Sequence, residues 1–214
     1  MEIAKLVLEY IRVFIWPITI VLLSMIFKNE IIYLLRRIKK ADFPGGVSIE
    51  TFPQEIREAK SLSREIKEEG KKEKKKSEPT IPLTEANARM LNLGLAPSPS
   101  GLEFSYYYNL IEQDPAIALA SLRIEFEIML KNIAKGFKVE INHRDGAGVI
   151  TKKLLEKSAI TSRQAELINH IIKLCNSAVH GFRVSSSQAE EIFKIAEVLR
   201  DQYISWLSWG FSDK

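Results

Sequence analysis

The sequence has a single cysteine, Cys175, and three histidines among its 214 residues. One thiol cannot form a disulfide within the chain, so a disulfide-stapled secreted fold is excluded and a reducing compartment is favoured. None of the histidines, which are His143, His170 and His180, has a cysteine or histidine partner at the spacing of a zinc motif. We therefore expect no metal and no other cofactor.

The net charge of the chain is +4, but the excess of basic residues is confined to a short segment near the N-terminus. Residues 28–76 hold 14 Lys and Arg against 9 Asp and Glu, whereas residues 77–214 hold 15 against 16. The longer segment lacks the broad positive field that is typical of nucleic-acid-binding domains. The basic segment near the N-terminus instead suits an anionic lipid surface.

One long stretch, from Val13 to Phe27, has no charged residue at all. These 15 residues would span only about 22 Å as a helix, short of a hydrocarbon core of roughly 30 Å. Extended back to Leu6, a helix over residues 6–27 would be about 33 Å long, which is enough. We therefore expect a single transmembrane helix, with the lipid bilayer as a partner. A buried core helix is the alternative, and a cleaved signal peptide is disfavoured because the positive charge follows the apolar run.

The basic residues that follow this stretch predict its orientation. They include Arg36, Arg37, Lys39 and Lys40. Since Lys and Arg are retained in the cytoplasm, we expect a single-pass protein of the inner (cytoplasmic) membrane, with its N-terminus outside and its C-terminal domain cytoplasmic. The amphipathic pattern of Glu30–Lys40 predicts a basic juxtamembrane helix on the membrane surface, or one that continues straight out of the bilayer. Residues 1–40 make up this first part.

Residues 41–101 read as a charged linker. Val47–Thr51 alternates apolar and polar residues like a short strand, but no partner strand is evident, which hints at pairing between chains. We expect a short helix from Pro53 to Gly70 and another at residues 84–92. The basic run Lys71–Lys76 is typical of a solvated tether, or of a nucleic-acid arm.

Residues 102–214 show helical periodicity throughout and predict an all-α bundle. Asp114 is placed as an N-cap before Pro115, and Gly136 as the stop of that helix. Capping-box spacing is found at Thr161/Gln164 and at Ser187/Glu190. The expected helices are Glu103–Gln113, Asp114–Gly136, Val149–Lys157, Thr161–Gly181, and one that opens at Ser187.

Two short motifs carry candidate chemistry. His143-Arg144-Asp145 matches the triplet of the protein-kinase catalytic loop, but no glycine-rich loop or Asp-Phe-Gly accompanies it, so a polar loop is the simpler interpretation. Asn176 and His180 are four residues apart and share one face near a helix C-terminus. That position favours the imidazolium and a proton-donating His180. The alternative is a histidine that helps to end the helix.

Three segments together resemble the HEPN-like domains over residues 103–208. Asp114–Glu127 looks like their first long helix, with the pattern Arg-x-x-x-Glu at Arg123 and Glu127. Leu154–Thr161 is similar to the short helix and turn that follow. Cys175–Gly181, with Ser187–Glu190 opening a last helix, is similar to their signature segment. The resemblance implies a helical bundle that commonly pairs as a dimer, and many such domains are ribonucleases in defence or RNA processing.

The resemblance also implies roles for individual residues. Asn176 and His180 match the catalytic positions, but Cys175 stands where the family's arginine is expected. Lys173 would supply charge without the bidentate fork of arginine. Arg123, Glu127 and Lys173 are the candidate binding residues.

Two functions follow. The first is a membrane-anchored binding or scaffolding module of a bacterial defence or stress system, which forms a homodimer or larger homo-oligomer and contacts a protein partner. The second is a ribonuclease that uses His180 on RNA or a nucleotide.

Overall fold

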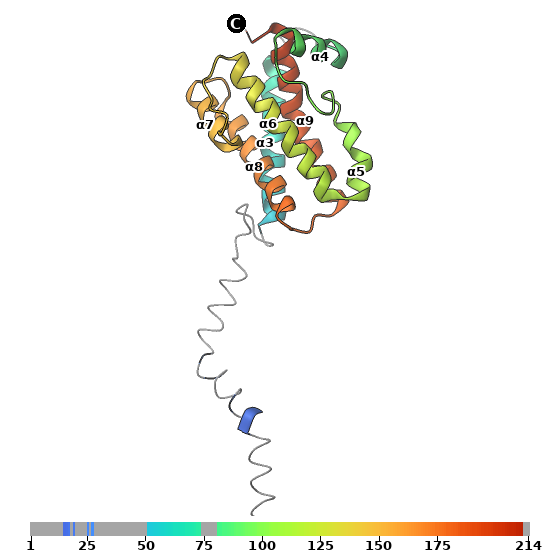
Figure 1. Cartoon of the computed structure of the whole chain (residues 1–214), viewed down its shortest axis with the longest axis vertical. Helices are drawn as coiled ribbons and strands as arrows, with labels where there is room; N and C mark the ends of the chain where they lie inside the picture. The colour runs from blue at the N-terminus through green and yellow to red at the C-terminus, as the bar shows by residue number, and fades with distance from the viewer. Residues whose placement is uncertain are drawn as a thin grey trace, which may run out of the picture. The chain divides into compact units, whose positions relative to one another are not determined.

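The computed structural model describes residues 51–73 and 81–211, together with residues 15–17, 19, 25 and 27. The chain divides into two compact units, residues 1–41 and 42–214, and the helices below belong to the second. They are α3 (Phe52–Glu73), α4 (Leu83–Asn92), the 3-10 helix η1 (Phe104–Tyr107), α5 (Tyr108–Gln113), α6 (Pro115–Gly136), α7 (Ala147–Glu156), α8 (Ser162–Val179) and α9 (Ser186–Trp209) (Figure 1). All regular structure within residues 51–73 and 81–211 is helical, as the all-α prediction requires.

The predicted transmembrane helix is corrected by the structure. Among the described residues, no helix has both the length and the apolar character needed to cross a bilayer. Even α6, the most apolar of the long helices, has charged side chains from Arg123 to Lys135. The single-pass topology, with its outside N-terminus and cytoplasmic C-terminal domain, loses its basis with the helix. Most of residues 6–27 lie outside the described part of the chain.

Two other predictions near the N-terminus also fall on residues that the structure does not describe. They are the juxtamembrane helix of Glu30–Lys40, with Arg36, Arg37, Lys39 and Lys40, and the strand-like piece, of which only Thr51 is described and lies in a turn.

Local end signals position the central helices. The Asp114 side chain accepts hydrogen bonds from the backbone N–H groups of Ala116 and Ile117, at 2.9 and 3.1 Å. The Thr161/Gln164 capping box is present as predicted. The last helix begins earlier than expected, because the box that forms is Ser185/Gln188 instead of Ser187/Glu190. Both pairs have the required spacing, so the pattern alone could not choose between them.

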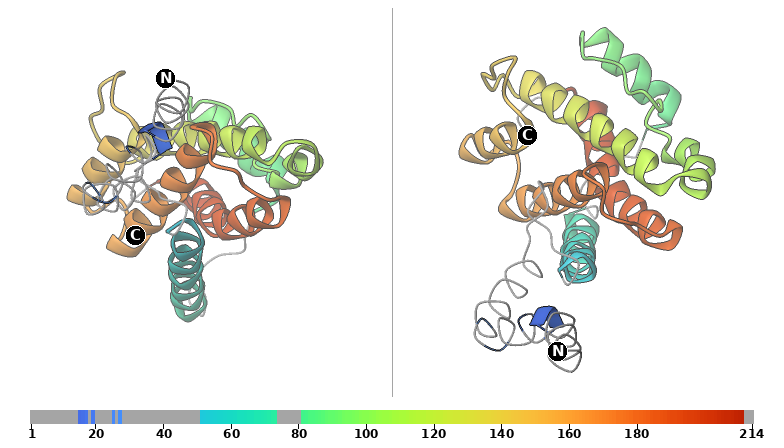
Figure 2. Two further views of the ribbon diagram at one scale, coloured as in Figure 1. Left: turned by 90° about the horizontal axis from the view of Figure 1, so that it is seen from below. Right: turned by 60° about the horizontal axis from the view of Figure 1, so that its bottom comes forward.

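The expected linker contains helices that pack on the bundle. Helix α3 lies beside α8 and α9, which both views in Figure 2 show. Its apolar residues recur at helical spacing and are buried: Phe52, Ile56, Ala59 and Ile66. Phe52 also stacks on Phe182 with ring centroids 4.2 Å apart. A thin apolar seam is sufficient here because α8 and α9 both pack on α3 and cover it.

Buried polar side chains of α6 form hydrogen bonds with the segment between α4 and η1, residues 93–103. The Asn132 amide donates to the Ala96 carbonyl and to the Tyr203 hydroxyl, at 2.8 and 3.0 Å. The Glu125 carboxylate accepts from the Tyr107 hydroxyl at 2.8 Å and from the Ser100 N–H at 2.6 Å. These buried groups are paired, as burial demands, so the segment is ordered without regular secondary structure.

Candidate functional site

The predicted catalytic pair lies where α8 ends. The N–H of Gly181 donates to the Ala178 carbonyl at 3.2 Å, and that of Phe182 to the Ser177 carbonyl at 2.9 Å. This is a Schellman motif, and it requires a left-handed residue, which Gly181 supplies with φ of +95°. His180 is therefore the C-cap residue of α8, and its side chain is exposed.

Asn176 is half-buried on the last turn of α8. Its Oδ1 atom is buried and has no hydrogen-bond partner among the described residues. A buried amide oxygen without a partner is uncommon, since leaving it unpaired costs about 1–3 kcal/mol. The structure thus brings Asn176 and His180 to the same helix end, and gives Asn176 one unused acceptor.

Cys175 stands where the family resemblance expects an arginine, and it is fully buried. Burial raises the pKa of its thiol to about 12, an effect that the nearby positive charge of Arg123 only partly offsets. The thiol is therefore neutral at ordinary pH and faces the core. It supplies neither a positive charge nor a nucleophile to the end of α8.

Arg123 and Glu127 pair with each other along α6. Their Nε and Oε1 atoms are 3.1 Å apart, and both side chains are about one-third exposed. An i,i+4 pair of this kind needs no ligand to explain it, and its contribution to stability is small. The two candidate binding residues are therefore paired with each other.

The side chain of Lys173 is directed towards α3. Its ammonium donates to Oε1 of Glu55. The other carboxylate oxygen, Oε2, is 2.5 Å from Nδ1 of His170. Burial alone would raise the Glu55 pKa, but the hydrogen bonds and charges of Lys173 and His170 lower it overall. The residue proposed to replace the arginine is thus engaged by a carboxylate of another helix.

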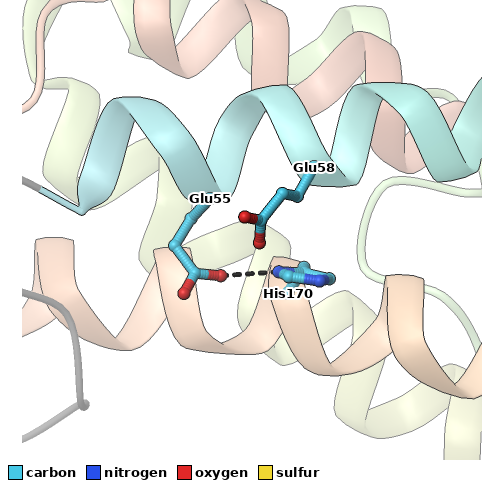
Figure 3. A group of neighbouring side chains, drawn as sticks. All are labelled: Glu55, Glu58 and His170. Carbon is cyan, nitrogen blue, oxygen red and sulfur yellow. Dashed lines mark hydrogen bonds and ion pairs between the residues drawn. The ribbon is translucent and has the colours of Figure 1, made fainter.

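Glu55, Glu58 and His170 form a second cluster, which the sequence analysis missed (Figure 3). One carboxylate oxygen from each glutamate and one ring nitrogen of His170 all lie within 4.8 Å of one another. Glu55 is buried, His170 is half-buried and Glu58 is exposed. Metal-motif spacing could not reveal the cluster, because 115 residues separate Glu55 from His170. The only local signal was an i,i+3 pair of glutamates beside the apolar seam of α3.

Comparison with known proteins identifies no relative of this chain. No family model, no curated protein and no solved structure gives a significant match to the chain. The resemblance to HEPN-like domains therefore depends on the sequence motifs and on the helical fold that they implied.

Proposed function

We propose that residues 51–211 act as a HEPN-like binding module and not as a nuclease. One observation carries this proposal: the Lys173 ammonium is bound by Glu55 of α3. RNA cleavage through a charged phosphorane needs a positioned positive charge beside the general acid or base. Cys175 is buried and neutral, and Lys173 is committed to α3, so neither of these residues meets that need.

The surface that suits binding is on α6. Ile117 and Ile124 are 53% and 54% exposed, and their separation of seven residues places them on one face, two turns apart. Val179, at the end of the adjacent helix α8, is 45% exposed. We propose that a second copy of the chain covers this face, in keeping with the dimers that the resemblance implies. The same resemblance supports a role in bacterial defence or stress response.

The dimer is tested by sedimentation of the 214-residue chain at micromolar concentration. The wild type should sediment as a dimer, and the Ile117→Glu, Ile124→Glu double variant as a monomer, because two carboxylates cannot be buried in an apolar contact. Leu91→Glu is the matched control, since Leu91 is 59% exposed on α4, and it should leave the dimer intact. A monomeric wild type would contradict the proposed interface.

The absence of catalysis is tested with single-stranded RNA. Cleavage by the wild type should not exceed background, and His180→Ala should cleave to the same extent. General acid–base groups contribute about 10²–10⁴-fold, so real catalysis by His180 would be visible. Cleavage that is abolished in His180→Ala, with the fold intact by circular dichroism, would refute the binding-only proposal.

A ribonuclease is the second candidate, and one observation favours it. Arg183 is exposed and only three residues beyond His180, at the same helix end as the unpaired Oδ1 of Asn176. In that case His180 acts as general acid or base towards the 2′-hydroxyl, and Arg183 supplies the charge. Arg183→Ala and His180→Ala would then each abolish cleavage, whereas Arg144→Ala, a change of another exposed arginine, would not.

A further inference from the structure

We propose that Glu55, Glu58 and His170 bind one divalent transition-metal ion of the zinc class. Two carboxylate oxygens and an imidazole nitrogen converge within 4.8 Å, and both kinds of atom are zinc ligands, three of which make up a catalytic-type site. The imidazole favours zinc-like ions over calcium and magnesium, which prefer all-oxygen sites. This inference does not depend on the binding module proposed above, although both use the contact between Lys173 and Glu55.

The ligands come from two helices, and both are anchored. Glu55 and Glu58 are one turn apart on α3, so their side chains leave the helix on the same side (Figure 3). His170 is on α8, against which α3 packs. Glu55 is held further by Lys173, which binds Oε1 and leaves Oε2 directed at His170. Such a contact to a ligand's second oxygen is the way that proteins usually orient metal-binding carboxylates.

Small side-chain movements suffice to receive the ion. In a tetrahedral site, metal–oxygen and metal–nitrogen bonds of about 2.0–2.2 Å place neighbouring ligand atoms roughly 3.3–3.6 Å apart. Nδ1 of His170 and Oε2 of Glu55 are now 2.5 Å apart through a hydrogen bond, so they need to separate slightly. The exposed Glu58 carboxylate moves inwards, which costs it only a hydrogen bond from Gln54. The ion then takes the place of the proton between His170 and Glu55.

The charges of the cluster also favour a cation. The two carboxylates contribute two negative charges and the Lys173 ammonium one positive charge, so with a neutral imidazole the group is anionic. A purely structural role explains Glu55, His170 and Lys173, whose hydrogen bonds join α3 to α8. The Glu58 carboxylate makes one surface hydrogen bond, from Gln54, and therefore stays available to a cation that offsets the repulsion between the two carboxylates.

The experiment is calorimetric titration of Zn²⁺ into the EDTA-treated 214-residue chain. One ion per chain should bind, and His170→Ala and Glu58→Gln should each weaken binding by at least about tenfold. The matched control is His143→Ala, which removes an exposed histidine from a loop and should bind as the wild type does. Co²⁺ gives a second readout, because its visible absorption should report imidazole ligation and be lost in His170→Ala.

Bound ion should also raise the melting temperature, since it joins α3 to α8 only in the folded state. Glu58→Gln keeps the proposal testable if His170→Ala fails to fold, because Glu58 is exposed and the change is isosteric. The proposal is overturned if the folded wild type binds no stoichiometric Zn²⁺. It is equally overturned if Glu58→Gln and folded His170→Ala bind as tightly as the wild type.

Discussion

The ammonium of Lys173 and the carboxylate of Glu55 join α8 to α3 across 118 residues of sequence. Glu55 is 10% exposed at its side chain and Lys173 36%, so the pair is partly shielded from water. Shielding makes the loss of one partner more costly than at a surface pair, because the buried carboxylate remains.

Lys173→Met should therefore destabilise the domain by about 1–3 kcal/mol. The measurement is urea unfolding followed by circular dichroism. Lys152→Met is the matched control, because Lys152 pairs with Glu156 at the surface with 78% of its side chain exposed, and it should change stability by less than about 0.5 kcal/mol. Equal effects of the two substitutions would mean that Lys173 does not stabilise a buried charge.

The stabilising effect of Glu55 should depend on pH. Its folded-state pKa lies below the ordinary value of 4.5, so its ionised form is favoured by folding. The stabilisation is fully present at pH values above the ordinary pKa of 4.5, and it is lost as the pH falls through the lower pKa of the folded state. Wild type and Glu55→Gln, unfolded with urea in the presence of a chelator, should differ most near neutral pH and converge in acid. A difference that stayed constant from neutral to acid pH would contradict this.

Replacing Cys175 with arginine should not restore a nuclease, although the family pattern has an arginine there. Cys175 is fully buried, so Cys175→Arg would place a guanidinium in the core and should cost more than about 3 kcal/mol. Cys175→Ala should cost only about 1 kcal/mol, since it leaves a small cavity. Unfolding experiments on both variants check this. A stable Cys175→Arg protein would show that the side chain can reach the solvent.

Gly181→Ala should destabilise the end of α8. The residue has φ of +95°, which an L-residue with a Cβ adopts at a cost of about 1–2 kcal/mol. Gly148→Ala is the matched control, because Gly148 is in the first turn of α7 with nothing within 4 Å of an added Cβ, and there alanine should stabilise by up to about 0.5 kcal/mol. Thermal unfolding of the two variants should shift in opposite directions. A shift in the same direction would argue against the Schellman motif.

The helix ends that were predicted correctly depend on contacts within a few residues of sequence. Asp114 caps α6 through the N–H groups two and three residues ahead, and Thr161 forms its box with Gln164. Such signals act before any tertiary packing exists, so a sequence displays them directly. The use of Ser185 instead of Ser187 shows the limit of such prediction. Both residues have capping-box spacing, and the sequence alone does not show which of the two boxes forms.

What the sequence did not reveal depends on long-range packing. The apolar seam of α3 is thin, so the sequence does not show where the helix packs. Because α3 packs on α8 and α9, Glu55 is buried and lies beside His170. Lys173 shares a helix with His180, yet its partner is on α3. The transmembrane expectation depended on an uncharged run, residues 13–27, extended to residue 6 to reach the length of a span, and such length is necessary for a span but does not establish one. No described helix meets both requirements.

The stacking of Phe52 on Phe182 has a consequence for where the chain can be cut. Phe182 follows His180 by two residues, so the first residue of α3 covers the turn that carries the candidate catalytic histidine. A fragment that begins at residue 83 or 102 would lose Phe52, Ile56 and Glu55 together, and would expose apolar surface on α8 and α9. A fragment that is to stay folded should therefore keep all of α3 and begin no later than Thr51, whose carbonyl accepts the Glu55 N–H.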